Sequence, residues 1–285
     1  MSILKIAIQK SGRLSEESVQ ILKDCGISVT NGNDQLKVAA SNFPLEVYFL
    51  RNSDIPQYLV DGVVDAAIVG ENLLTEKNQA IQIVEKLGFS KCKVSIAVPK
   101  SFNYNTIEDL NGLKIATSYP KTVSDYFRSK KVGIEIHEIS GSVEIAPNIG
   151  LSDAIVDIVS SGSTLFKNNL KEVEVILTSE AVLAVSPSIS TAAKSILDKL
   201  QFRIQSVLRA RKSKYILMNI PDAKIPEVNK ILPVLKSPTV MPLALKGWSS
   251  VHSVIDEEKF WDVIDQLKAA GAEGILVCPI EKIVS

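Results

Sequence analysis

The chain has 285 residues, of which 46% are hydrophobic and 22% charged, as is typical of a globular protein with a sizeable buried core. Basic and acidic residues number 32 each, and this zero net charge excludes a general electrostatic attraction to nucleic acid or to an anionic membrane. Three widely spaced cysteines and two histidines argue against a disulfide framework, a histidine-rich metal site and a histidine-centred catalytic triad.

The N-terminus, MSILKIAIQKSG, lacks the charged, apolar and small-residue segments of a signal sequence, and no apolar run approaches the length of a membrane span. We therefore expect a cytoplasmic protein with neither a nucleic-acid nor a membrane partner. Cys25, Cys92 and Cys278 are expected to be small buried residues, and His137 and His252 to be ordinary structural ones.

The first part of the chain alternates short strands with helices. Leu4–Ile8 predicts a buried strand, which is followed by a loop and by a helix for which Ser15 is the expected N-cap. A second helix is predicted to begin at residues 53–56 and to run to Gly62, and Asp65–Gly70 predicts the next strand. Strands that alternate with helices in this way indicate a parallel sheet with helical crossovers.

Two stretches of similar design indicate two α/β lobes. GVVDAAIVGENLL, from Gly62, and GLSDAIVDIVSSGSTL, from Gly150, share a glycine, an aspartate, a β-branched run and a polar loop, although so short a match also arises by chance. Two apolar strands that end in proline, Lys93–Pro99 and Ala181–Pro187, are predicted to lead out of the first lobe and back into it. We expect residues 1–96 and 181–211 to form one lobe and residues 97–180 to form the other.

The remainder, residues 212–285, has a different order of elements. A long helix from Thr191 to about Arg211 is predicted to connect it to the lobes. Beyond that helix we expect a strand, a helix, two strands, a helix capped by Asp256 and a last strand, which is the order of the ferredoxin-like unit. The predicted bounds are 215–220, 225–235, 239–245, 251–255, 256–270 and 274–280.

Residues 141–165, GSVEIAPNIGLSDAIVDIVSSGSTL, end in four hydroxyl residues around one glycine. Residues 154–159 fit either a helix or a buried strand by periodicity, and we prefer the strand because it places the loop before a helix that begins near Ser163. Free N–H groups at a helix start would then form a cradle for phosphate, lined by Ser160, Ser161, Gly162, Ser163 and Thr164. Asp157 suits ribose hydroxyls or Mg²⁺ instead, so the combination predicts a phosphorylated sugar. The alternative is a solvated loop in which Asp153 caps a turn.

Several further side chains are candidates for the same site, and each has a plain structural alternative. Lys10 and Arg13 flank a glycine after the first strand, where open α/β sheets bind ligands and where two cations could neutralise a polyphosphate. The alternative for this pair is a solvated basic turn. Arg51 could be a surface charge, Glu144 an acid that interacts with a helix end, and Tyr119 a turn aromatic before a proline.

Several quoted stretches together resemble one family. QKSGRLSEES, DIPQYLVDGVVDAAIVGEN, IATSYP and residues 141–165 are similar, in this order, to ATP phosphoribosyltransferase. The pattern Glu-x-Ala-Pro, Gly-x-x-Asp-Ala-x-x-Asp and Gly-x-Thr-Leu is far more specific than a lone glycine motif. SKYILMNIP, SPTVMPL and AAGAEGILVCPIEK resemble the regulatory domain of the family's long form. The resemblance implies a two-lobed, periplasmic-binding-protein-like catalytic region and a C-terminal ACT-like domain.

The resemblance also implies an activity. N1 of ATP would attack C1 of phosphoribosyl pyrophosphate, giving phosphoribosyl-ATP and pyrophosphate in the first step of histidine biosynthesis. Asp157 and the 160–164 loop would bind phosphoribosyl pyrophosphate, with Lys10, Arg13 and Arg51 on the polyphosphates and Mg²⁺ bridging phosphate oxygens. Arg13, Arg51, Tyr119 and Glu144 would contact the nucleotide.

Regulation and assembly follow from the same resemblance. It implies feedback inhibition by free histidine and a homo-oligomer, from dimer to hexamer. Thr239 and Gly274 match positions of the histidine pocket, whereas Asn219 stands where some members have an aspartate. The competing interpretation is a two-lobed small-molecule sensor without catalysis, because a two-lobed fold fits both functions. Lys10, Arg13 and the sugar-phosphate loop favour the enzyme, since a plain amino-acid sensor needs none of them.

Overall fold

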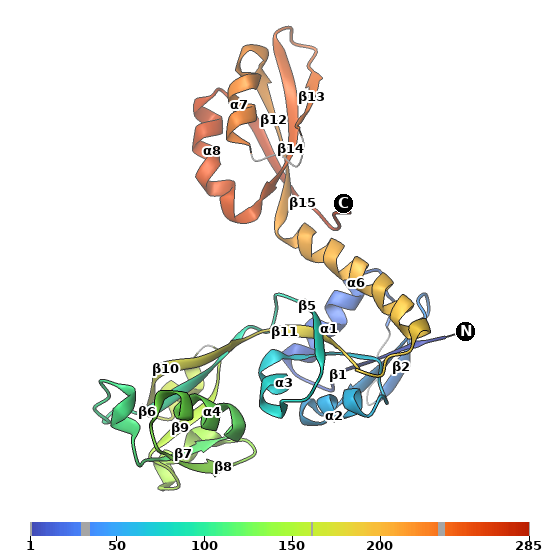
Figure 1. Ribbon diagram of the computed structural model, residues 1–285. Helices are drawn as coiled ribbons and strands as arrows, with labels where there is room; N and C mark the ends of the chain where they lie inside the picture. Colours follow the sequence, from blue (N-terminus) through green and yellow to red (C-terminus); the bar gives the residue numbers. More distant parts are fainter. Residues whose placement is uncertain (1, 30–34, 161, 233–236, 285) are drawn as a thin grey trace. The chain divides into compact units, whose positions relative to one another are not determined.

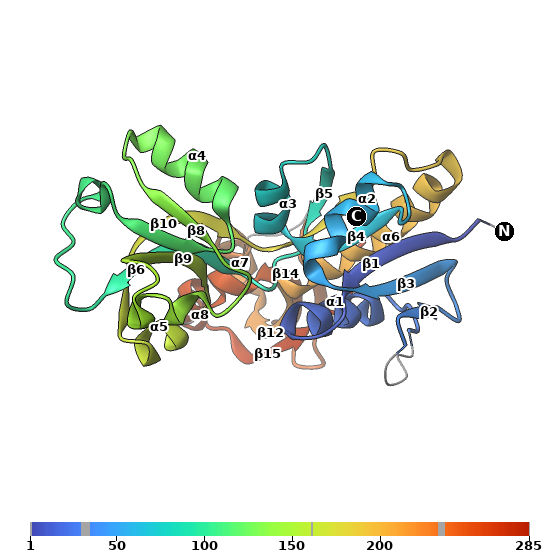
Figure 2. The ribbon, with the colours of Figure 1, turned by 90° about the horizontal axis from the view of Figure 1, so that it is seen from below.

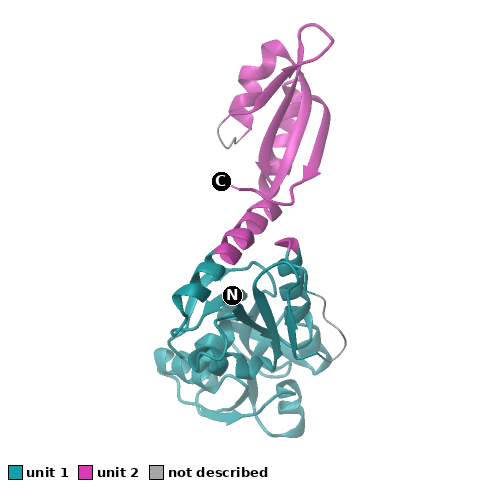
Figure 3. Ribbon diagram, turned by 90° about the vertical axis from the view of Figure 1, so that its right-hand side faces the viewer, with its two compact units in different colours: residues 1–23, 27–198 teal, residues 24–26, 199–285 magenta. Residues whose placement is uncertain are grey.

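The computed structural model describes residues 2–29, 35–160, 162–232 and 237–284. Packing divides the chain into two compact units, residues 1–23 with 27–198 and residues 24–26 with 199–285, coloured teal and magenta in Figure 3. The division falls inside helix α6 (Thr191–Arg211), whose bounds are those predicted. The three predicted domain ranges, with a boundary after residue 211, stay a prediction. Among the helices described, none is both long and apolar enough to cross a bilayer.

The first lobe is built on a six-stranded sheet with the order β2-β3-β1-β4-β11-β5. β1 pairs in parallel with both β3 and β4, and β11 returns antiparallel to β4. The predicted strands at residues 4–8 and 65–70 are confirmed. The sheet consists of β1 (Leu4–Gln9), β2 (Lys37–Ala39), β3 (Leu45–Leu50), β4 (Ala66–Gly70), β5 (Gln82–Lys86) and β11 (Ala181–Val185).

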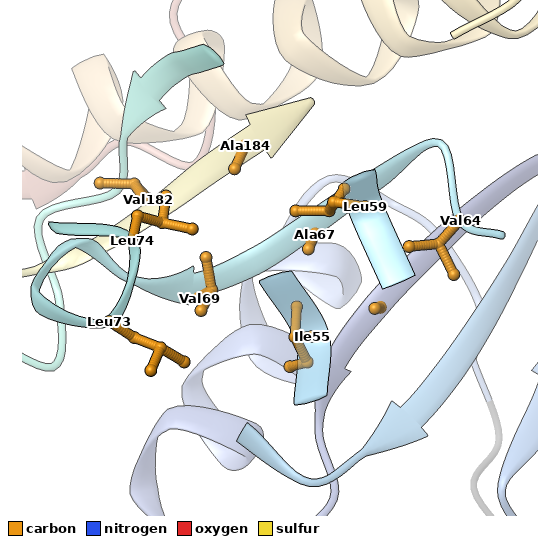
Figure 4. Packing of buried hydrophobic residues seen from close by; sticks show 10 residues of the cluster. Ile55, Leu59, Val64, Ala67, Val69, Leu73, Leu74, Val182 and Ala184 are labelled. Carbon is orange, nitrogen blue, oxygen red and sulfur yellow. The ribbon is translucent and has the colours of Figure 1, made fainter. Parts of the chain in front are cut away.

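Helices α1 (Arg13–Asp24), α2 (Ile55–Val60) and α3 (Glu71–Lys77) follow strands of this sheet. α2 and α3 bury apolar side chains against β1, β4 and β11 in the cluster shown in Figure 4. The prediction that Ser15 caps the first helix is wrong: α1 begins two residues earlier, and Ser15 is buried within it. Gly12, at φ +87°, makes the turn before the helix, and its carbonyl accepts the first helical hydrogen bond from Glu16 N at 3.1 Å.

The second lobe is built on a five-stranded sheet with the order β10-β6-β9-β7-β8. Residues 154–159 form strand β9, as preferred, and α5 begins at Ser163. Figure 2 shows α4 and α5 on opposite sides of this sheet. Successive β9 side chains face opposite sides, so Ala154 and Val156 pack in the cluster that includes α4, and Ile155 and Val159 in the cluster that includes α5. The elements are β6 (Cys92–Pro99), β7 (Lys114–Thr117), α4 (Pro120–Lys130), β8 (Glu135–Glu138), β9 (Ala154–Val159), α5 (Ser163–Lys167) and β10 (Leu170–Ser179).

The two lobes repeat one topology, so the sequence echo is confirmed. Reading β3, β1, β4, β11 and β5 against β8, β7, β9, β6 and β10 gives the same order and the same parallel or antiparallel pairing at each step. The echoed aspartates also do the same work. Asp65 accepts the Lys5 N–H through Oδ2 at 2.8 Å, and Asp153 accepts the Lys114 N–H in the same way at 2.8 Å. Each aspartate therefore fixes the start of the neighbouring parallel strand.

The C-terminal unit carries the predicted ferredoxin-like order, visible at the top of Figure 1. Its antiparallel sheet has the order β13-β14-β12-β15, and the two helices pack on one face. Asp256 caps the last helical segment, as predicted, by accepting the Glu258 N–H at 3.2 Å. The predicted strand to Leu245 is too long, since β13 ends at Pro242, which lacks the N–H that a ladder needs. The elements are β12 (Ser213–Pro221), α7 (Ile225–Ile231), β13 (Thr239–Pro242), β14 (Trp248–Asp256), α8 (Phe260–Ala269) and β15 (Glu273–Pro279).

Candidate active site

A cavity of about 230 Å³ opens where β9 ends and the hydroxyl loop begins. Gly162, at φ +72°, supplies the left-handed turn that starts α5, a conformation that side-chain-bearing residues rarely adopt. Ser163 is the first residue of α5, and Ser161 lies outside the described residues. The described lining consists of Glu144, Asp157, Ile158, Val159, Ser160, Gly162, Thr164 and Leu165. The structure thus brings most of the predicted sugar-phosphate residues together with Glu144.

Asp157 is the central acid of this cavity. Its position on β9 places it on the α5 side of the sheet, and its Oδ1 accepts the N–H of Ile158 at 2.8 Å. Burial raises the pKa of the Asp157 carboxyl, the Ile158 N–H opposes that rise, and the negative charge of Glu144 adds to it. Two carboxylates within electrostatic reach repel phosphate but attract hydroxyl groups or a developing positive charge. The phosphate-binding part of the site must therefore lie towards the N–H groups and hydroxyls of the loop.

The predicted basic residues belong to the first lobe. Lys10 follows β1 and Arg51 follows β3, and the Lys10 N–H donates to Leu50 O at 2.8 Å, so both residues leave one edge of the sheet side by side. Both side chains are exposed. Arg13 begins α1, and its Nε donates to Glu17 Oε1 at 3.3 Å. None of these three is among the described residues that line the cavity at Asp157.

Tyr119 stands at the equivalent edge of the second sheet, between β7 and α4. Its hydroxyl accepts a hydrogen bond from Asn72 Nδ2 at 3.0 Å. Burial raises the pKa of that hydroxyl, and the negative charge of Asp157 raises it further. Tyr119 therefore lies within electrostatic reach of the candidate sugar site.

Three residues of this region were not predicted from the sequence: Asn72 and Glu76 on α3, and Ser179 at the end of β10. Asn72 is 4% exposed, and Ser179 is 6% exposed. A signal existed in the echo between the two lobes, because it aligns GENLL of the first lobe with the hydroxyl loop of the second. Because polar side chains occupy the hydroxyl loop of the second lobe, the corresponding polar residue of the first lobe, Asn72, was also a candidate for a functional role.

A second cavity, of about 410 Å³, adjoins the first and shares Val159 and Ser160 with it. Its charged lining consists of three lysines and two glutamates: Lys86, Lys91, Lys93, Glu71 and Glu180. Lys86 Nζ lies 3.0 Å from Glu71 Oε2, and Lys93 Nζ lies 3.6 Å from Glu172 Oε1. The lysine side chains of both pairs are exposed, at 59% and 51%, so the pairs hold them only weakly.

The cysteines fit their predicted role only in part. Cys25 is buried and Cys92 half-buried, but Cys278 is exposed because it lies on the edge strand β15. The prediction that all three are buried is therefore wrong for Cys278. Among the residues that the structure describes, no three His, Cys, Asp or Glu side chains come together as a metal site.

The predicted regulatory residues are distributed over the C-terminal sheet. Asn219 on β12 and Gly274 on β15 are neighbours, because a Cβ atom at Gly274 would lie 3.5 Å from Asn219 Nδ2. Thr239 lies on β13, at the opposite edge, where it pairs with His252 of β14. The sheet therefore brings two of the three together within one chain.

Comparisons with known proteins agree with this architecture. The sequence model of ATP phosphoribosyltransferase matches residues 51–206, and that of the HisG C-terminal domain matches residues 210–282. The ATP phosphoribosyltransferase of Cytophaga hutchinsonii is 59% identical over 283 residues, which are 99% of each chain. A chain of the ATP phosphoribosyl transferase (HisG:HisZ) complex from Thermotoga maritima aligns with a TM-score of 0.60 at 32% identity, over 71% of this chain and 99% of that one.

More distant structures share only the fold. Tv2483 bound to L-arginine aligns with a TM-score of 0.50 at 16% identity, over 71% of this chain and 84% of that one. The mixed α/β fold with two lobes of the periplasmic-binding-protein type and a C-terminal domain is thus as predicted. From the family-model matches and the 59% identity over almost its full length, the chain belongs to the ATP phosphoribosyltransferase family of transferases.

Proposed function

We propose that the protein joins N1 of ATP to C1 of phosphoribosyl pyrophosphate, as the first step of histidine biosynthesis in the cytoplasm. The N1 lone pair forms the new bond to C1, and the C1–O bond breaks with its electron pair leaving on pyrophosphate. The observation that carries this proposal is the cavity in which Asp157 and Glu144 stand beside the hydroxyl loop. Carboxylates next to a phosphate cradle suit a phosphorylated sugar whose C1 becomes positive during the reaction.

The second lobe would hold the sugar phosphate. The 5-phosphate would lie at the start of α5, near Ser160, Gly162, Ser163 and Thr164, whose N–H groups and hydroxyls could donate to it. Ser161, outside the described residues, stays a candidate from the sequence. Asp157 would accept hydrogen bonds from the ribose hydroxyls and stabilise positive charge at C1. Tyr119 and Glu144 would orient the adenine so that N1 approaches C1 from the side opposite pyrophosphate.

The first lobe would supply cations. Lys10, Arg13 and Arg51 would neutralise the pyrophosphate and the triphosphate, which carry more charge than the loop alone can balance. Mg²⁺ would be held mainly by the phosphate oxygens of the substrates, and Asp157 and Glu144 are the cavity carboxylates that could add a ligand. The bound ion would lower the charge on the leaving pyrophosphate.

Pyrophosphate release from purified protein, given ATP, phosphoribosyl pyrophosphate and Mg²⁺, tests the proposal. Asp157→Ala should lower turnover by about 100-fold or more, the usual worth of a group that stabilises transition-state charge. Asp153→Asn is the matched control, because this aspartate stands in the same segment but holds the Lys114 N–H outside the described cavity. If wild-type protein binds a nucleotide without releasing pyrophosphate, the two-lobed sensor is the better interpretation.

We also propose regulation and assembly through the C-terminal domain. The sheet face opposite the helices exposes Tyr215 and Leu276, at 37% and 57%, and such an apolar face favours a homo-oligomer, between dimer and hexamer. Free histidine would bind near Asn219, Thr239 and Gly274 and inhibit the enzyme. Histidine titration of the activity, with sedimentation at each concentration, checks both points: an unchanged rate would remove the regulatory proposal and leave catalysis untouched.

A further inference from the structure

Asn72 connects the two lobes inside the N-terminal unit through hydrogen bonds to Ser179 and Tyr119. Its backbone N–H donates to Ser179 Oγ at 2.9 Å, and Ser179 Oγ–H donates to Asn72 Oδ1 at 2.9 Å. Its Nδ2 donates to the hydroxyl oxygen of Tyr119 at 3.0 Å. Because Asn72 and Ser179 are almost fully buried, water does not compete for these groups.

The direction of each bond follows from the one before it. Ser179 accepts from a backbone N–H, so its single hydroxyl hydrogen is available for Asn72 Oδ1. With Oδ1 engaged there, the amide turns its NH₂ group to Tyr119. The Tyr119 oxygen consequently acts as an acceptor towards α3, and its own hydrogen is left to point elsewhere. Tyr119 is thereby prepared as a hydrogen-bond donor.

Glu76, one helical turn after Asn72, holds the backbone that follows Tyr119. Its carboxylate accepts the N–H of Lys121 at 2.9 Å and the N–H and hydroxyl of Thr122 at 2.8 and 2.7 Å. Residues four apart on a helix share one face. One face of α3 therefore fixes both the hydroxyl of Tyr119 and the start of α4, which Tyr119 directly precedes as the N-cap residue.

We propose that Asn72 is a positioning residue for the transferase reaction, which directs the Tyr119 hydroxyl hydrogen into the site as a donor to the nucleotide. This inference rests on the proposed function and extends it. Besides supplying cations, the first lobe would orient Tyr119, a residue of the second lobe that contacts the nucleotide. Purine ring nitrogens accept hydrogen bonds, so a fixed donor selects the ring orientation in which N1 faces C1. Asn72 acts through Tyr119 and needs no contact with the substrate.

A double-mutant cycle tests this inference. Asn72→Ala and Tyr119→Phe should each weaken ATP binding about tenfold, the worth of one hydrogen bond, and leave the KM for phosphoribosyl pyrophosphate within about twofold. In the Tyr119→Phe background, Asn72→Ala should cost almost nothing more, because its effect passes through the missing hydroxyl. Thr75→Ala, an exposed neighbour on α3, is the control and should leave ATP binding unchanged.

A spectroscopic readout separates positioning from a general loss of structure. The ¹³Cζ resonance of labelled Tyr119 should shift in Asn72→Ala without ligand, since the bond to its oxygen is lost. If Asn72→Ala fails to fold, Ser179→Ala is the second variant. It keeps the Asn72 amide, removes the hydroxyl that fixes the orientation of that amide, and should weaken ATP binding about threefold.

Three results would contradict either the positioning role of Asn72 or the proposed function. Equal losses from Asn72→Ala in both backgrounds, with normal wild-type turnover, would show a purely structural role and end this inference alone. Wild-type protein without turnover would remove the proposed function, whereas an unshifted Tyr119 resonance in Asn72→Ala would still decide against the positioning role.

Discussion

Gly70→Ala should destabilise the N-terminal unit through one atom. Gly70 has φ −69° and ψ 132°, which alanine adopts without strain, so the backbone is not the cause. A Cβ atom at this position would lie 2.4 Å from Asn72 Oδ1, far inside the 3.0 Å below which such contacts essentially never occur. Asn72 is 4% exposed and has little room to retreat, so its side chain must break away from Ser179 and Tyr119.

The size of the effect follows from those contacts. Two hydrogen bonds of a buried amide are lost, at about 1 kcal/mol each, so we expect a loss of about 2 kcal/mol in the free energy of unfolding. For a unit of this size that loss corresponds to a fall of about 4–8 °C in Tm. The poorer N-cap preference of alanine and the lower entropy of its unfolded chain nearly cancel, since each is about 1 kcal/mol or less and they have opposite signs.

Thermal unfolding by circular dichroism measures the change, and the Asn72→Ala background supplies the decisive comparison. Without Oδ1 there is no clash, so Gly70→Ala should then change Tm by less than about 1 °C. An equal fall in both backgrounds, or no fall in either, would refute the reasoning.

Three further predictions rest on other groups. Burial raises the folded-state pKa of Asp157 above 3.8, so the ionised carboxylate lowers the stability of the fold at neutral pH. Asp157→Asn should therefore raise Tm at pH 7, and this gain should disappear as the pH falls through the folded-state pKa. A gain that does not depend on pH would contradict this explanation. Asp65→Ala and Asp153→Ala should each cost about 1–2 kcal/mol in urea unfolding, because each leaves a strand N–H unpaired; clearly unequal losses would count against equivalent roles. Burial raises the pKa of Cys25 to about 11, so at pH 8 a thiol reagent followed by mass spectrometry should label exposed Cys278 well before Cys25, and the reverse order would be contrary evidence.

Much of the fold follows from local pattern. The helix at residues 191–211 was predicted with its observed bounds, because its length and apolar period exclude a strand. Strand β9 was ambiguous by itself and was settled by its neighbours, a polar loop and a helix start. Ser15 misled because a serine followed by two glutamates is typical of a cap, while the turn at Gly12 decides where α1 begins.

The residues of the candidate site could be grouped from the sequence where they are local. Asp157 and the hydroxyl loop stand within eight residues, and Lys10 and Arg51 follow neighbouring parallel strands that end at a shared edge. Asn72 escaped notice because its partners lie 47 and 107 residues away, and sequence spacing does not reveal that an amide is buried between them. The exposure of Cys278 likewise depends on which strand forms the sheet edge.

The repeated topology of the two lobes has a consequence for how such a protein diversifies. The segments that follow β4 and β9 occupy equivalent places in the two sheets, yet the first begins α3 with the buried amide of Asn72, and the second carries the exposed Ser160 and the turn at Gly162. In the first lobe this segment connects the two lobes through hydrogen bonds, and in the second lobe it lines the candidate site. The aspartate that fixes the start of a neighbouring strand is present in both lobes. One topology thus serves two roles through a few residues after equivalent strands, which predicts that exchange of these segments between the lobes preserves folding and abolishes binding.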